Sequence, residues 1–67
     1  MTDTVGFIGL GVLGSAIAEN LVSGGLKVVG FDISKTARRD AANVGVTLVD
    51  TPEAVARSAD IVFTCLP

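Results

Sequence analysis

The chain has 67 residues, of which 49% are hydrophobic and 18% are charged, and its formal net charge is −2. This composition excludes an intrinsically disordered chain, because it supplies enough apolar residues to form a core. The only adjacent basic residues are Arg38 and Arg39, so the sequence lacks the basic patch that binds nucleic acid or an anionic membrane.

The N-terminus and the cysteine content indicate where the protein is located and whether it binds a metal. The first residues lack the basic start and long apolar run of a signal peptide, and no apolar run approaches the roughly 20 residues of a membrane span. We therefore expect a cytoplasmic protein with neither membrane nor nucleic acid as a partner. Cys65 is the single cysteine and histidine is absent, so we expect no metal site and a packing role for Cys65.

The first predicted unit is a strand, a turn and a helix. Residues 4–9 form a short apolar run that ends in glycine, which is typical of a strand buried on both faces. From Leu13 the spacing changes: Leu13, Ile17 and Leu21 recur every fourth position, with Ala18 and Val22 beside them, as on one face of a helix. The glycine pair at 24–25 predicts the end of this helix.

The rest of the chain repeats this alternation of short apolar runs and helical segments. Helix starts are indicated by Ser34 and by the pair Thr51 and Pro52, because a hydroxyl oxygen accepts from first-turn amides and proline suits the first helical position. The predicted elements are a strand at 27–32, a helix from Ser34 to Gly45, a strand at 46–49, a short helix through Ser58 and a strand at 60–67.

Strands that alternate with helices over short connections indicate βαβ units. We therefore expect an α/β fold with a Rossmann-type parallel sheet and helices on both faces. Right-handed crossovers and the usual doubly wound order place the strands in the order 3-2-1-4. The fourth strand then lies at an edge where Ile61, Val62 and Phe63 lack a partner, so we expect residues 1–67 to be the N-terminal part of a longer domain.

Glycines concentrate between the first strand and the first helix. Gly9, Gly11 and Gly14 form the pattern G-x-G-x-x-G. The first permits a tight turn, the second lets a pyrophosphate approach the backbone, and the third lets the helix pack closely on the strand. Gly6 lies inside the strand, where we expect it to permit close helix contact. The alternative is that all four glycines serve only tight packing.

The surroundings of this glycine pattern favour dinucleotide binding. The N–H groups around Val12 and Leu13 lie in the first helical turn, where the helix dipole favours an anion. Asp32 lies at the end of the second predicted strand, 18 residues beyond Gly14, where its carboxylate can accept hydrogen bonds from adenosine ribose hydroxyls. The same charge repels the 2′-phosphate of NADP, so we expect NAD as the cofactor.

Three basic side chains near Asp32 are an argument for NADP instead of NAD. Lys35, Arg38 and Arg39 follow Asp32, and a nearby cation can accommodate the 2′-phosphate of NADP. We interpret them as solvated positions on the second helix, with NADP binding as the alternative.

Two stretches together, GFIGLGVLGSAIAENLVSGGLKVVGFD and ADIVFTCLP, resemble the N-terminus of the β-hydroxyacid dehydrogenases. This family includes 3-hydroxyisobutyrate dehydrogenase, tartronate semialdehyde reductase and L-threonate dehydrogenase. The resemblance covers nearly the whole chain. Leu13 and Ile17 depart from it, since many relatives carry methionine at both positions.

The resemblance implies a set of NAD-binding residues. The loop from Gly9 to Gly14, including Leu10, would hold the pyrophosphate, whereas Asp32 and Ile33 would border the adenosine. Leu66 and Pro67, after the fourth strand, would line the dinucleotide. NADP-using relatives often carry Asn-Arg-Thr where this chain has Asp32, Ile33 and Ser34, which favours NAD.

The same resemblance places the catalytic lysine and the segment that binds the substrate carboxylate beyond residue 67. Lys27 and Lys35 match neither, so we assign no catalytic residue. We expect an NAD-dependent oxidoreductase that acts on a small β-hydroxyacid and forms a homo-oligomer at full length, with no activity in these 67 residues alone. The alternatives are another Rossmann dehydrogenase or imine reductase, and a non-catalytic NAD-sensing module completed by a partner chain.

Overall fold

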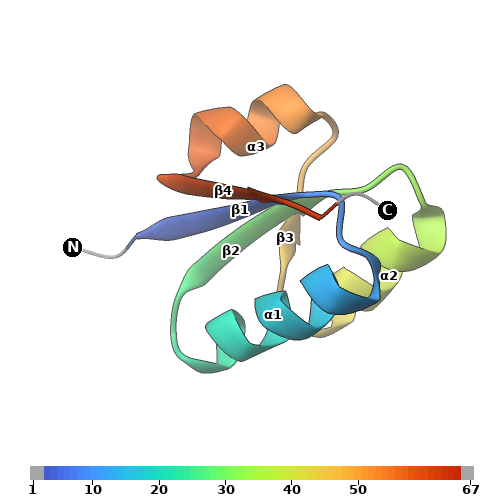
Figure 1. The fold of residues 1–67 in the computed structure, drawn as a ribbon, viewed down its shortest axis with the longest axis horizontal. Coiled ribbons are helices and arrows are strands. Elements are labelled where there is room, and N and C mark those ends of the chain that lie inside the picture. Colours follow the sequence, from blue (N-terminus) through green and yellow to red (C-terminus); the bar gives the residue numbers. More distant parts are fainter. Residues whose placement is uncertain (1–2, 66–67) are drawn as a thin grey trace.

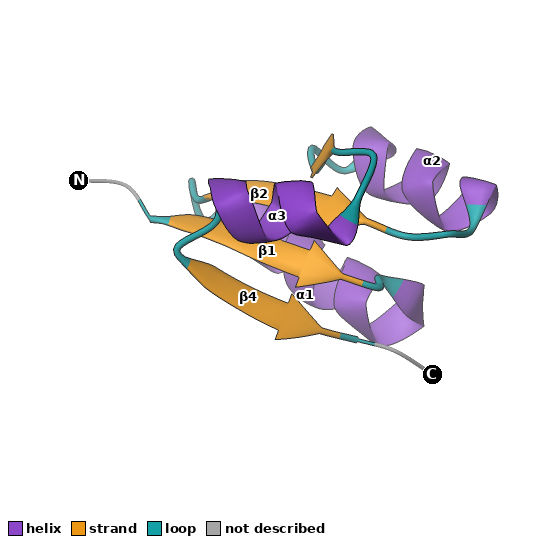
Figure 2. Ribbon diagram, turned by 90° about the horizontal axis from the view of Figure 1, so that it is seen from above, coloured by secondary structure: helices purple, strands orange, loops and turns teal. Residues whose placement is uncertain are grey.

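The computed structural model describes residues 3–65, which form a parallel sheet with helices on both faces (Figures 1 and 2). The elements in chain order are β1 (Thr4–Ile8), α1 (Gly11–Ser23), β2 (Lys27–Phe31), α2 (Lys35–Asn43), β3 (Thr47–Leu48), α3 (Pro52–Ser58) and β4 (Ile61–Thr64). The four strands have the order β3-β2-β1-β4 and all pairs are parallel. The predicted fold class and strand order are confirmed.

The sheet separates two helical layers. Figure 1 shows α3 on one face and both α1 and α2 on the other. Strand β1 lies between β2 and β4, with Phe7 opposite Gly30 on one side and Phe63 on the other. The rings of Phe7 and Phe63 stack with their centroids 5.5 Å apart.

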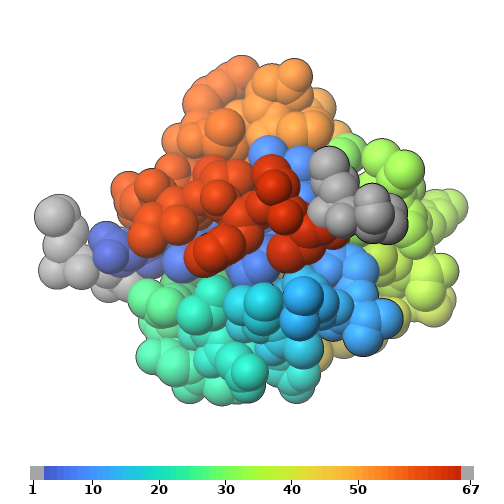
Figure 3. Space-filling model, viewed as in Figure 1, coloured from blue at the N-terminus to red at the C-terminus, as the bar shows by residue number. Residues whose placement is uncertain are grey.

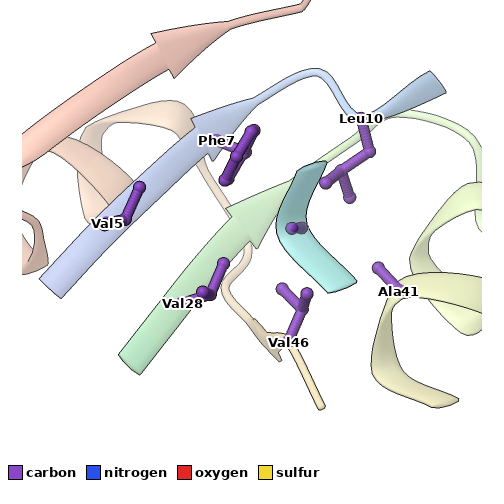
Figure 4. Close-up of a cluster of buried hydrophobic side chains, with 7 residues drawn as sticks. Val5, Phe7, Leu10, Val28, Ala41 and Val46 are labelled. Carbon is purple, nitrogen blue, oxygen red and sulfur yellow. The ribbon is translucent and has the colours of Figure 1, made fainter. Parts of the chain in front are cut away.

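The main core lies between the sheet and the α1–α2 layer. Figure 4 shows its side chains converging from both strands and helices. Four of its residues are completely buried: Phe7, Leu10, Ala18 and Ala41. Their burial removes apolar surface from water, which stabilises the fold by about 25 cal/mol for each Å². The cluster of buried residues is Val5, Phe7, Leu10, Ala18, Val28, Ala41 and Val46.

Both predicted N-caps are present. The Ser34 hydroxyl accepts from the amide of Ala37 at 3.2 Å, and the Thr51 hydroxyl accepts from the amide of Ala54 at 3.1 Å. Each bond satisfies one first-turn amide that the helix itself leaves without a partner. These caps fix where α2 and α3 begin, and α2 begins directly beside the carboxyl end of β2.

Helix α1 occupies the predicted segment, and most of the predicted face is buried. Ala18 is completely buried, and Leu21 and Val22 pack against the main core. Leu13 and Ile17 are instead 71% and 37% exposed. The prediction is wrong for these two residues, because small residues bring the first half of the helix close to the sheet and the larger side chains point sideways.

Strand β3 is shorter than predicted, because only Thr47 and Leu48 pair with β2. One further bond, from the amide of Val49 to the carbonyl of Gly30 at 3.0 Å, extends the contact. Val46 is instead buried in the main core. An edge strand with a single neighbour has fewer ladder bonds to define its ends.

The opposite edge strand, β4, has the exposure that the strand order predicts. Ile61, Val62 and Phe63 are 50%, 39% and 46% exposed. Figure 3 shows β4, in red, on the face turned toward the viewer, between α3 above and α1 below.

Within residues 3–65, no helix is long and apolar enough to cross a bilayer.

Gly6 permits α3 to lie against the middle of β1, as predicted. A Cβ at this position would lie 2.6 Å from Val55 Cγ1 and 2.8 Å from Ala59 Cβ. Neither distance is compatible with normal van der Waals contact. The strand therefore needs glycine here for packing, independently of any ligand.

Gly6→Ala should destabilise the protein by about 1–3 kcal/mol, because the added methyl group overpacks the α3 contact. Urea unfolding of the two proteins measures this difference. Gly24→Ala is the matched control, since its Cβ would meet only atoms at 3.5 Å and should change stability by less than about 1 kcal/mol. Equal stability of the Gly6→Ala variant and the wild type would contradict the packing role.

Candidate nucleotide-binding site

A cleft opens at the carboxyl ends of β1, β2 and β4. It has a volume of about 790 Å³ and is lined by the β1–α1 loop, the end of β2, the start of α2, and Thr64 and Cys65 at the end of β4. The chain leaves β1 toward β2 on one side and returns to β4 on the other. Such a reversal of strand order is where open parallel sheets bind ligands.

The loop from Gly9 to Gly14, called the glycine loop below, uses two glycines in the left-handed region. Gly9 has φ 83° and Gly11 has φ 57°. The amide of Gly9 donates to the carbonyl of Phe31 at 2.8 Å, which ties the loop to β2. A Cβ on Gly11 would meet no described heavy atom within 4 Å. Gly11 therefore leaves open space on the side of the cleft.

Gly14 allows a close approach of α1 to two neighbours. A Cβ at Gly14 would lie 3.1 Å from Cys65 Cβ and 3.3 Å from Cys65 Sγ. The carbonyl oxygen of Gly9, directly after β1, would lie 3.5 Å away. The third glycine therefore lets α1 approach the end of β1, as predicted, and approach Cys65 more closely still. Cys65 packs against the main core, in agreement with its predicted role.

The N-terminus of α1 faces the cleft without a side-chain cap. Leu10 is its N-cap residue, and its apolar side chain makes no cap bond. Val12 and Leu13 are 92% and 71% exposed. Amides in this position have no intrahelical acceptor, and with the helix dipole they attract an anion. This arrangement and the space beside Gly11 fit a diphosphate.

Asp32 lies beside the start of α1, and its carboxylate accepts from two backbone amides. Its Oδ1 accepts from Ser34 at 2.8 Å and its Oδ2 accepts from Leu10 at 2.8 Å. The Ser34 amide lowers the pKa of the Asp32 carboxyl most; burial opposes this, while the amides of Leu10 and Gly11 and the charge of Arg38 lower it further. The carboxylate is therefore ionised at neutral pH and can accept further hydrogen bonds.

The depressed pKa of Asp32 predicts how stability changes in acid. The carboxyl of Asp32 binds a proton less readily in the folded chain than in the unfolded chain. Its contribution to the free energy of unfolding is therefore fully present above the usual pKa of 3.8 and is lost as the pH falls through the lower pKa of the folded chain. Unfolding free energies measured between about pH 5 and pH 1 should fall less steeply in Asp32→Asn than in the wild type. Equal slopes in the two proteins would contradict the assignment.

The three cations near Asp32 occupy different environments. Lys35 and Arg39 are exposed, as predicted. Arg38 is half-buried, and its Nη1 donates to the main-chain carbonyl of Asp32 at 2.7 Å. The prediction of a solvated side chain was wrong for Arg38, because the turn after β2 brings this carbonyl within its reach.

The structure brings together every predicted cofactor residue that it describes. The residues lining the cleft include Gly9, Leu10, Gly11, Val12, Leu13, Gly14, Asp32 and Ile33. Leu10 is buried, so only its backbone is available there, whereas Ile33 is 87% exposed. Leu66 and Pro67 lie outside the described residues.

Sequence reasoning missed Thr64 and Cys65 as lining residues. Their position at the carboxyl end of a strand adjacent to β1 is the signal that could have identified them. Sequence reasoning also missed the bond between Asp32 and Leu10, which spans 22 positions and has no local pattern.

The matching family model is described as the NAD binding domain of 6-phosphogluconate dehydrogenase, and it covers residues 4–67. The chain belongs to this family.

Individual relatives of the chain support the same family assignment. It is 48% identical over 65 residues to the "Probable 3-hydroxyisobutyrate dehydrogenase" of Mycobacterium tuberculosis, covering 96% of this chain and 22% of that protein. It is 41% identical over 63 residues to the mitochondrial 3-hydroxyisobutyrate dehydrogenase of Drosophila melanogaster, covering 94% of this chain and 19% of that protein.

A solved structure agrees with these relatives. The Mycobacterium tuberculosis 3-hydroxyisobutyrate dehydrogenase with L-serine superposes with a TM-score of 0.94 at 40% identity, covering all of this chain and 23% of that one. The resemblance to the β-hydroxyacid dehydrogenases, in their N-terminal NAD-binding segment, is therefore confirmed, and the comparisons support NAD as the cofactor. The chain spans about a fifth of the length of these relatives.

Proposed function

We propose that this chain is the N-terminal part of the NAD-binding domain of a longer oxidoreductase, which transfers a hydride between NAD and a small β-hydroxyacid. The observation that carries the proposal is the cleft itself. An uncapped helix N-terminus, the open space beside Gly11 and the ionised Asp32 all face it. These are the features that a dinucleotide with two phosphates and a ribose requires.

The parts of the cleft fit different parts of NAD. The first-turn amides around Val12 and Leu13 would hold the diphosphate, because both residues line the cleft beside Gly11 at the start of α1. Asp32 would accept hydrogen bonds from the adenosine ribose hydroxyls, and Ile33 would contact the adenine. Leu66 and Pro67 remain predicted contacts of the dinucleotide. When bound, NAD supplies the hydride acceptor, while this chain binds and orients it.

The charge of Asp32 favours NAD over NADP in this proposal. A 2′-phosphate at the ribose would lie beside a carboxylate whose pKa is depressed, which is an unfavourable interaction at neutral pH. Arg38 is the nearest candidate for a compensating charge. Its bond to the carbonyl of Asp32 occupies part of its guanidinium.

The catalytic residues and the substrate site would lie outside this chain. Asp32 and Cys65 are the titratable side chains among the described residues that line the cleft, and the proposal gives them roles in cofactor binding and in packing. The names of the relatives support 3-hydroxyisobutyrate as the first substrate to test. A homo-oligomeric full-length enzyme and a cytoplasmic location are further parts of the proposal.

Turnover by the full-length protein tests this function. The protein is incubated with NAD and each of several small β-hydroxyacids, 3-hydroxyisobutyrate first, and NADH formation is followed by absorbance. We expect turnover with at least one hydroxyacid and none with the corresponding acid that lacks the hydroxyl. Tight NAD binding without turnover of any hydroxyacid would instead favour the non-catalytic NAD-sensing module.

A further inference from the structure

Asp32 joins three segments of the cleft. Its Oδ2 accepts from the amide of Leu10 in the glycine loop, and its Oδ1 accepts from the amide of Ser34, both at 2.8 Å. Its main-chain carbonyl accepts from Arg38 Nη1 at 2.7 Å. The end of β2 is therefore held both to the glycine loop and to the start of α2.

These bonds place the carboxylate before any ligand arrives. The Ser34 bond closes a turn of the kind that aspartate forms with the amide two residues on, and the Arg38 bond holds the same turn from α2. The Leu10 bond then reaches from this fixed turn to the N-cap residue of α1. Because the chain enters α1 through Leu10, the direction of its amide sets the direction of the amides that follow.

We propose that Asp32 is a positioning residue for the diphosphate as well as the partner of the ribose. By holding the Leu10 amide, it orients the glycine loop in the ligand-free protein. The inference rests on the nucleotide site proposed above and deepens it, since one side chain then couples recognition of the ribose to recognition of the diphosphate.

The two roles of Asp32 are compatible. An ionised carboxylate has about four lone-pair positions on its two oxygens, and two of them accept the backbone bonds. The others remain for ribose hydroxyls, so the nucleotide binds without breaking the Leu10 bond. Asparagine is a poor substitute, because it has one acceptor oxygen and its NH₂ group would face one of the two amide donors.

Nucleotide analogues separate positioning from ribose recognition. The full-length protein is titrated with ADP and with 2′,3′-dideoxy-ADP, which has no hydroxyls for Asp32 to bind. Asp32→Glu keeps the charge but moves the carboxylate by one methylene, so the two backbone bonds cannot both form with the present geometry. We expect this variant to bind the dideoxy analogue about tenfold more weakly than the wild type does, while Asp3→Glu binds it equally well. Equal affinity of Asp32→Glu and the wild type for the analogue would overturn the proposal.

Hydrogen exchange tests the same clamp without a ligand. In Asp32→Ala, amides of the glycine loop should exchange about tenfold faster than in the wild type, while those of β1 and β2 keep their rates. A uniform increase across all three segments indicates a purely structural role and overturns the proposal, as does an unchanged loop. A wild-type protein that binds neither ADP nor NAD would contradict the nucleotide site instead, and the exchange rates would still decide the clamp.

Discussion

Gly11→Val should reduce the affinity for NAD by about 100-fold or more, which corresponds to about 2.7 kcal/mol of binding free energy. The space beside Gly11 is open in the ligand-free protein, so the added side chain meets the diphosphate rather than the protein. Valine must also adopt the φ of 57°, which costs about 1–2 kcal/mol of folding stability. Calorimetric titration of NAD measures the first effect, and urea unfolding measures the second.

Gly25→Val is the matched control for Gly11→Val. Gly25 also has a positive φ, 90°, and its Cβ would meet no described atom within 4 Å. It lies beyond the other end of α1, about 20 Å from the glycine loop at 1.5 Å of rise per residue. We expect a similar loss of stability with unchanged NAD affinity. Wild-type NAD affinity in Gly11→Val would contradict the placement of the diphosphate.

Asp32→Asn should move the preference between NAD and NADP by about tenfold to 100-fold toward NADP. The substitution removes the charge that opposes the 2′-phosphate, and NAD also loses a good acceptor for its ribose hydroxyls. The dissociation constants of both dinucleotides give the ratio for each protein. Asp3→Asn removes the same charge at the amino end of the sheet and should leave the ratio unchanged. If the ratio were the same in Asp32→Asn and the wild type, Asp32 would have no role in this choice.

The fold could be predicted because its signals are local. The glycine pattern, the caps at Ser34 and Thr51 and the short apolar runs each define an element from neighbouring residues. The strand order then followed from the handedness of βαβ connections. The exposure of β4 was equally predictable, since the order alone places this strand at an edge.

The exposure of Leu13 and Ile17 could not be predicted in the same way. They share the spacing of Leu21, which packs against the core, but at their end of α1 the buried residues are Gly14 and Ala18. Close packing on a sheet selects small side chains, and this preference depends on the distance between the helix and the sheet. A hydrophobic pattern carries no information about that distance.

The chemistry of the site was only partly visible in the sequence. The type and position of Asp32 predict a partner for ribose, but its bonds to Leu10 and Ser34 depend on the folded path of two loops. The same holds for Arg38, which resembles its exposed neighbours in the sequence and differs only through the turn that it contacts.

Equilibrium binding of NAD and NADP to the full-length protein decides whether the cleft is an NAD site. We expect saturable binding of one NAD per chain, with an affinity at least about tenfold higher than that for NADP. No saturable binding of NAD, or binding of NADP that is equally tight or tighter, would contradict the NAD site.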